Sequence, residues 1–277
     1  MSSPPSPLAA PLPWDLVATD YAREIVPHFE RYARDALRLA APRARARILD
    51  VACGPGTLTL LAAAEAEQVT AIDFSPEMIG RLRARLAERG LGNVEARIGD
   101  GQALPLPDAS FDAAFSMFGL MFFPDRDRGL REIRRVLVPG GRVAIGSWLP
   151  LSEVPLLAAV LTTMREGLLR VWKTGDLPIG DPHPPLGTEE AMRTELAAAG
   201  FHDVEAHRVE HSWAFPDAAA FSATMRRTLA PLVLLRHELG AEGFRPIDDA
   251  IDARIAEVAG PGPAQVTMPA WIGVGTA

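Results

Sequence analysis

Three aspartates that follow short apolar runs have the type and spacing to form a ligand site. Asp50 opens residues 50–57, which read Asp-Val-Ala-Cys-Gly-Pro-Gly-Thr. Asp73 ends the next apolar run, and Asp100 follows the third. The glycines of the first segment allow the backbone to turn sharply and to approach a ligand closely. These residues predict a polar site built around a glycine-containing turn.

The glycine segment fits two phosphate-binding motifs poorly. A dinucleotide-binding motif requires Gly or Ala three residues after the second glycine, and Thr59 stands at that position. A P-loop requires Gly-Lys followed by Ser or Thr, which is absent here. Residues 48–80 contain neither Lys nor Arg. The segment therefore favours a nucleoside-like ligand that lacks phosphate and carries positive charge.

The other two aspartates suit the remaining parts of such a ligand. A carboxylate at the position of Asp73 can accept hydrogen bonds from both hydroxyls of a ribose. Asp100 can accept from an exocyclic amine, while the next backbone N–H donates to a ring nitrogen of adenine. Each aspartate alone is better explained as a cap or turn residue. At the C-terminal ends of three successive parallel strands, where ligands bind in such sheets, they jointly predict a site.

The chain resembles the class I S-adenosylmethionine-dependent methyltransferases over about residues 45–150. The subgroup that it resembles is the small-molecule type of ubiquinone and menaquinone biosynthesis. The resemblance implies transfer of the methyl group of S-adenosylmethionine to a small, fairly apolar acceptor by in-line displacement, with S-adenosylhomocysteine as product. A quinone, a phenolic compound or a polyketide would fit. Four segments carry the resemblance, in the family's order: residues 48–57, 73–78, 100–112 and 134–142.

The resemblance also implies roles for single residues. Asp50 and the glycine backbone would hold the methionine end of the cofactor, and Asp73 its ribose. Tyr21 would reach the cofactor carboxylate, although a role as a core aromatic is an equal alternative. The implied cofactor-binding residues are Tyr21, Asp50, Ala52, Gly54, Gly56, Asp73, Phe74, Met78, Asp100, Gly101, Gln102, Ser116 and Met117.

The sequence departs from the family pattern in two places. Ala52 stands where many relatives have glycine, and residues 116–125 lack the histidines that many relatives carry there. The second departure makes this wall of the site apolar, and we assign no catalytic residue and no metal ligand. Phe118, Met121 and Trp213 are the candidates for contact with the acceptor, which they predict to be apolar.

The elements that position these residues alternate between apolar strands and charged helices. This order predicts an α/β fold with a doubly wound, mostly parallel, seven-stranded sheet. We expect a disordered segment at 1–13 and a single domain at 14–277, with helical insertions at about 149–187 and 216–260. The insertions form either a lid over the ligand or a dimer interface.

Composition restricts the partners and the compartment. The chain has 277 residues, 48% of them hydrophobic, and a net charge of −7, which disfavours binding to nucleic acid. One cysteine makes no demand on an oxidising compartment, and no apolar stretch is long enough to span a bilayer. We therefore expect a cytoplasmic protein with a small-molecule substrate and no membrane insertion; a homodimer stays open.

Two rival functions remain from the sequence. The chain could be an inactive methyltransferase fold that serves as a binding or scaffold protein, although its cofactor motifs are complete. It could also use the cofactor for other chemistry, or methylate RNA or protein. A motif such as Asn-Pro-Pro-Tyr after the fourth strand would indicate that class, and residues 116–119 read Ser-Met-Phe-Gly instead.

Overall fold

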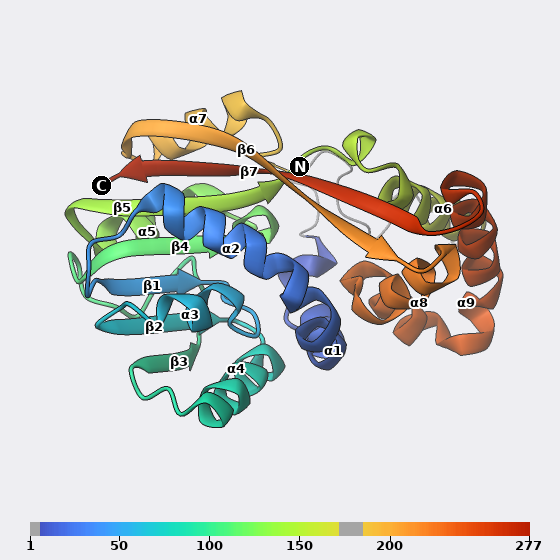
Figure 1. Ribbon diagram of the computed structural model, residues 1–277, viewed down its shortest axis with the longest axis horizontal. Helices are drawn as coiled ribbons and strands as arrows, with labels where there is room; N and C mark the ends of the chain where they lie inside the picture. The colour runs from blue at the N-terminus through green and yellow to red at the C-terminus, as the bar shows by residue number, and fades with distance from the viewer. Residues whose placement is uncertain (1–5, 172–184) are drawn as a thin grey trace.

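A seven-stranded sheet forms the centre of the computed structural model, which describes residues 6–171 and 185–277 (Figure 1). The strand order is β3-β2-β1-β4-β5-β7-β6. The five strands from β3 to β5 are parallel, and β7 runs antiparallel to both β5 and β6. This confirms the predicted fold class. The strands are β1 (Arg47–Val51), β2 (Gln68–Asp73), β3 (Val94–Ile98), β4 (Phe111–Met117), β5 (Leu137–Trp148), β6 (His202–Phe215) and β7 (Ala264–Thr276).

The central strands are apolar on both faces because helices cover both sides of the sheet. β1 and β4 are almost entirely buried, as expected for the inner strands of a parallel sheet. Local signals start several helices: the Ser75 hydroxyl accepts from the N–H of Met78, and Pro76 follows at the first helical position. The helices here are α2 (Val26–Ala40), α3 (Thr57–Ala62), α4 (Pro76–Arg89), α5 (Arg126–Val136) and α7 (Glu189–Ala198).

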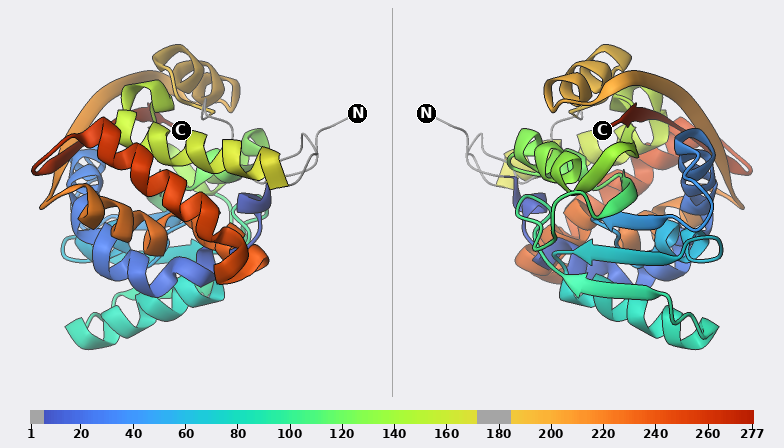
Figure 2. Two further views of the ribbon diagram at one scale, coloured as in Figure 1. Left: turned by 90° about the vertical axis from the view of Figure 1, so that its right-hand side faces the viewer. Right: turned by 90° about the vertical axis from the view of Figure 1, so that its left-hand side faces the viewer.

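A second group of helices gathers at the C-terminal ends of the parallel strands. It consists of α1 (Leu12–Asp20), α6 (Pro155–Val171), α8 (Ala218–Thr228) and α9 (Ala230–Ala259). Figure 1 shows these helices beyond the arrowheads of the parallel strands, and the left view of Figure 2 shows the molecule from that end. Helices α8 and α9 are inserted between β6 and β7. The first half of β7, residues 264–269, extends beyond the pairing with β5 and pairs only with β6.

Helices lie within both stretches for which the sequence predicts insertions; whether they form a lid or a dimer interface stays a prediction. Helix α6 falls within 149–187, and α8 and α9 fall within 216–260. Helix α9 is interrupted at Gly240, whose φ is 69°. Part of the first insertion, residues 172–184, lies outside the described residues. Across the ranges that are described, no helix is both long and apolar enough to cross a membrane.

The prediction of a disordered segment at 1–13 is wrong for residues 7–13. A 3-10 helix, η1, spans Pro7–Ala9, and α1 begins at Leu12. Leu8 is buried in a cluster with Met78 and Ala230, and the indole N–H of Trp14 donates to the Leu8 carbonyl at 2.9 Å. The packing partners are distant in sequence, so composition alone gave no sign of them. Residues 1–5 lie outside the described residues.

Candidate functional site

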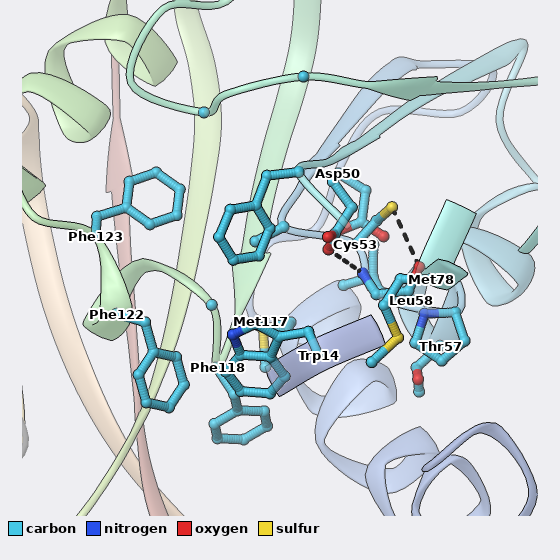
Figure 3. A pocket seen from close by; sticks show the side chains of 18 of the residues that line it. Trp14, Asp50, Cys53, Thr57, Leu58, Met78, Met117, Phe118, Phe122 and Phe123 are labelled. Carbon is cyan, nitrogen blue, oxygen red and sulfur yellow. Dashed lines mark hydrogen bonds between the residues drawn. The ribbon is translucent and has the colours of Figure 1, made fainter. Parts of the chain in front are cut away.

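A pocket of about 990 Å³, measured out to its open mouth, lies at the C-terminal ends of β1, β2 and β4. The N-terminal helices cover it, and Figure 3 shows Trp14, Asp50 and Phe118 among the side chains in its wall. Ligands bind at this edge in open α/β sheets. The wall contains eleven of the thirteen predicted cofactor residues: Tyr21, Asp50, Ala52, Gly54, Asp73, Phe74, Met78, Asp100, Gly101, Gln102 and Met117.

Asp73 is held by two backbone donors at the end of β2. The N–H of Gly54 donates to one carboxylate oxygen at 2.8 Å, and the N–H of Ser75 donates to the other at 2.9 Å. The side chain is only 6% exposed, yet it borders the pocket. A carboxylate has about four acceptor positions, so two remain for donors on a ligand. Asp73 can therefore accept from two neighbouring hydroxyls.

Asp50 is buried at the end of β1 and has one side-chain partner. The hydroxyl of Thr59, in the first turn of α3, donates to the Asp50 carboxylate at 2.6 Å. Thr59, the residue that fits a dinucleotide motif poorly, therefore orients the Asp50 carboxylate. This contact leaves acceptor capacity on Asp50 for a donor in the pocket.

The two buried carboxyls make the pocket favourable for a cation. Burial raises the pKa of Asp50 to about 7 and the pKa of Asp73 to about 6. Among the described residues that line the pocket there is no Lys or Arg to compensate their charge. A positively charged ligand group would stabilise the ionised forms.

This arrangement predicts a pH dependence. An aspartate in the unfolded chain titrates near about 3.9, so between about pH 4 and pH 7 the folded protein retains protons that the unfolded chain has released. These two groups therefore lower the free energy of unfolding as the pH rises through that range. A cationic ligand should release protons near pH 6.5 and bind more tightly as the pH rises to about 7.5. Calorimetric titration in two buffers of different ionisation enthalpy measures this release; ligand binding without it would contradict the prediction.

The opposite end of the pocket is formed by the loop after β3. The Gln102 backbone N–H donates to Asp100 at 2.8 Å, and the Gln102 side chain accepts from the N–H of Asp125 at 2.8 Å. Asp100 is exposed, and its carboxylate remains accessible. Phe123 packs against Gly101, where an added Cβ would lie 2.6 Å from the ring. A flat ring system could bind here with its edge toward Asp100 and Gly101.

Two predicted cofactor residues do not line the pocket. Gly56 caps α3 with a φ of 85°, and a Cβ on it would lie 2.3 Å from a methyl carbon of Leu82. Its role is to let α3 and α4 pack closely. Ser116 is fully buried within β4, and its hydroxyl has no partner among the described residues. The contact expected of Ser116 is through its backbone, so the burial of its side chain does not test that prediction. The neighbouring residue Met117 lines the pocket.

The N-terminal segment contributes residues that the sequence analysis missed. Trp14 and Phe29 line the pocket from α1 and α2, on either side of a π-helical turn, η2 (Tyr21–Ile25). The Ser75 hydroxyl donates to the Asp15 carboxylate at 2.5 Å, which joins α1 to the start of α4. The apolar spacing in this region predicts helices but not what they cover. Other lining residues that were missed are Cys53, Leu58, Gly119, Phe122 and Phe123.

Tyr21 borders the pocket from η2. Its pKa is raised by burial and, secondarily, by the charge of Asp73. The phenol therefore stays protonated near neutral pH and can donate a hydrogen bond. Its aromatic ring also meets Phe29 edge to face at 5.8 Å. The two alternatives for Tyr21, ligand contact and core packing, are both compatible with this position.

A second, larger cavity adjoins the first. It measures about 2100 Å³ out to its open mouth and is bordered by α6, α8, the start of α9 and the outer half of β7. All three predicted acceptor residues, Phe118, Met121 and Trp213, lie in its wall. Phe118 also borders the first pocket. Arg165 is the one charged side chain among the described residues that line the cavity.

Comparison with known proteins finds methyltransferases among the proteins that are similar to this chain. A family model described as a methyltransferase domain matches residues 48–141. The demethylmenaquinone methyltransferase of Thermus thermophilus is 40% identical over 183 residues, which is 62% of this chain and 81% of that protein. Nocamycin O-methyltransferase of Saccharothrix syringae is 32% identical over 203 residues, which is 69% of this chain and 71% of that protein.

Other similarities extend over a smaller region or concern the fold alone. An uncharacterized protein of Mycobacterium tuberculosis is 40% identical over 102 residues, so the matched region spans 37% of this chain and 37% of that protein. The crystal structure of the YcgJ protein of Bacillus subtilis has a TM-score of 0.58 and 17% identity, and the match covers 89% of this chain and 97% of that chain. At this identity the likeness concerns the architecture.

Proposed function

The chain belongs to the class I S-adenosylmethionine-dependent methyltransferases, and on this premise we propose that it methylates a small, fairly apolar acceptor. The observation that carries the proposal is the pair of adjoining cavities. One is bordered by the family's motif loops and buried carboxylates, and the other is largely apolar. A methyl donor in the first would face an acceptor in the second.

The residues of the first pocket fit S-adenosylmethionine. The free acceptor positions of Asp73 suit two ribose hydroxyls, and Asp100 with the backbone of Gly101 suits the edge of adenine. Asp50 and the loop at Gly54 suit the cationic methionine end. The pocket also lacks the Lys or Arg that a phosphate would require, among the described residues that line it. The bound cofactor supplies a methyl group on a positively charged sulfur, which is already a strong electrophile.

The lining of the second cavity favours an apolar metabolite as the acceptor. Its wall combines Met, Leu, Val and aromatic side chains, several of them from α6, α8 and β7, and such a lining favours an apolar ligand. The similarity to proteins named demethylmenaquinone methyltransferase and nocamycin O-methyltransferase supports a quinone-like or polyketide-like acceptor. The second of these names also supports oxygen as the acceptor atom. The helices that border the cavity would serve as its lid.

The protein's own contribution is alignment and exclusion of water. Holding two reactants in one orientation can remove a large part of a reaction barrier, and a closed apolar site keeps water from competing. Tyr21 borders both cavities and keeps its phenolic proton, because its pKa is raised. It can therefore orient an acceptor oxygen by donating a hydrogen bond. A cytoplasmic location and a homodimer remain predictions from the sequence.

Methyl transfer from labelled S-adenosylmethionine tests the proposal directly. The protein would be incubated with quinols, phenols and polyketide-like enols that carry apolar substituents, and in parallel with peptides and RNA. Label should appear in at least one apolar compound and in neither macromolecule. Label in peptide or RNA would contradict the proposed acceptor class. Cofactor binding without transfer to any compound in a broad panel would favour the inactive-scaffold alternative.

A Met121→Ala variant separates the acceptor from the cofactor. Met121 lines only the larger cavity, so its truncation should raise the KM for the acceptor by about 5- to 30-fold, which corresponds to about 1–2 kcal/mol of lost apolar contact. The dissociation constant of S-adenosylmethionine should change less than about twofold. Parallel kinetics and calorimetry measure the two quantities. Equal weakening of both ligands would mean that Met121 supports the fold and not the acceptor.

A further inference from the structure

The boundary between the two cavities consists of aromatic side chains. Every described residue that lines both of them is aromatic, and together we call these residues the aromatic collar. They come from two regions of the chain, the N-terminal helices and the segment that follows β4. Figure 3 shows three of the rings on one side of the first pocket, with Asp50 and Cys53 on the other side. The collar is Trp14, Tyr21, Phe29, Phe118 and Phe122.

The collar rings hold one another in place. Trp14 meets Phe122 edge to face, with centroids 5.0 Å apart, and Phe29 meets Phe118 at 5.2 Å. Tyr21 in turn meets Phe29 at 5.8 Å. Such edge and tilted contacts are favourable between aromatic rings. The collar contacts therefore join the N-terminal helices to the segment after β4.

Phe118 adopts a backbone conformation that a bulky residue rarely takes. Its φ is 64°, in the left-handed region. A hydrogen bond from its N–H to the Gly146 carbonyl, at 3.0 Å, and a stack of its ring on Trp148, at 3.8 Å and 8°, hold it there. Strained conformations of this kind persist mainly where the surrounding structure over-determines them, often at binding sites. The conformation turns the ring toward the boundary between the cavities.

The charge distribution indicates what the collar faces. Asp50 and Asp73 are buried on the cofactor side, and the described residues of that pocket include neither Lys nor Arg. A positive charge is therefore favoured there by the carboxylates. The negative face of an aromatic ring attracts a cation as well, and most strongly where water is excluded. Collar and carboxylates would thus both favour a ligand that carries positive charge.

We propose that the aromatic collar binds the positively charged sulfur of S-adenosylmethionine and so distinguishes the methyl donor from its neutral product. This inference rests on the proposed function, because it takes the first pocket as the cofactor site. S-Adenosylhomocysteine carries a neutral thioether at the same place. Transfer of the methyl group removes the charge and with it the cation–π attraction. The collar would therefore weaken its hold on the cofactor once the reaction is complete.

Binding of charged and neutral ligands to collar variants tests this inference. Phe118→Leu and Phe122→Leu each remove one ring and retain an apolar side chain. Each variant should weaken binding of S-adenosylmethionine by about tenfold, and that of S-adenosylhomocysteine by less than about twofold. Sinefungin, in which a carbon that bears a protonated amine replaces the methylated sulfur, should follow S-adenosylmethionine. Calorimetric titration gives all three dissociation constants without a turnover measurement.

Phe123→Leu is the matched control, since Phe123 lines the first pocket but not the second cavity. It should weaken the charged and neutral ligands by the same factor. Two collar variants are tested because one of them could misfold. Thermal unfolding detects such misfolding. If the collar variants weakened the binding of charged and neutral ligands equally, the inference about the collar would be overturned and the proposed function would stand. If the wild-type protein bound neither S-adenosylmethionine nor its product, the proposed function would fall, and the inference with it.

Discussion

An Asp73→Ala variant is expected to bind S-adenosylmethionine about 10- to 100-fold more weakly and to unfold at a lower denaturant concentration. The binding loss follows from the missing acceptor for the ribose hydroxyls, which is worth about 1–3 kcal/mol. The stability loss has a separate cause. The N–H groups of Gly54 and Ser75 both donate to this carboxylate, and each would lose its partner. We expect a decrease of about 2–4 kcal/mol in the free energy of unfolding.

An Asp73→Asn variant separates these two effects. The amide oxygen can still accept from one backbone N–H, so more of the stability should remain. Ligand binding should still be weak, because an amide cannot accept from the ribose hydroxyls as a carboxylate does. Asp249→Ala, at an exposed position on α9, is the control and should behave like the wild-type protein. Calorimetry and urea denaturation measure both quantities, and unchanged affinity in Asp73→Ala would remove the ribose assignment.

A Gly119→Ala variant should have a comparably large effect through packing. An added Cβ at Gly119 would lie 2.3 Å from the Cβ of Ala52, in the loop after the neighbouring strand β1. Overpacking of this kind costs about 1–3 kcal/mol, and it would push apart two loops that both line the cofactor pocket. Urea denaturation and titration with S-adenosylmethionine should both show a clear loss.

The contact between Gly119 and Ala52 allows a rescue experiment. Ala52→Gly combined with Gly119→Ala removes the obstructing methyl group and should restore stability and binding. Ala52 already has a φ of 55°, a conformation that glycine adopts at no steric cost. Gly92→Ala is the matched control, because nothing lies near the added Cβ there. A double variant as defective as Gly119→Ala alone would show that this contact is not the cause.

The cofactor half of the site could be predicted from sequence because its signals are local. Each of Asp50, Asp73 and Asp100 lies at or just beyond the C-terminal end of its own strand, and a parallel sheet brings such strand ends to one edge. Gly56 and Ser116 do not line the pocket, because a motif fixes the path of the backbone but not which residues border a cavity; their expected backbone contacts with the cofactor stay predictions. The contact of Gly56 with Leu82 depends on how two helices pack, and no local pattern encodes it.

The acceptor half depends on contacts between distant segments. Phe118 and Trp213 were recognised as apolar candidates, but the shared boundary of the two cavities brings Trp14 and Phe29 against the segment after β4. About ninety residues of sequence separate these regions, and the helical periodicity of the N-terminal region does not indicate which segment it packs against. Residues 7–13 are structured for the same reason, because Leu8 is buried against the distant residues Met78 and Ala230. Tertiary packing decides both features.

Isothermal titration of the wild-type protein with S-adenosylmethionine, S-adenosylhomocysteine and NAD tests the central claim most directly. The buried carboxylates and the absence of Lys and Arg among the described residues of the pocket wall lead us to expect micromolar binding of the first two and no binding of NAD. Binding of NAD, or of none of the three, would contradict the cofactor assignment. The roles proposed for Asp50, Asp73 and the aromatic collar would then have to be withdrawn.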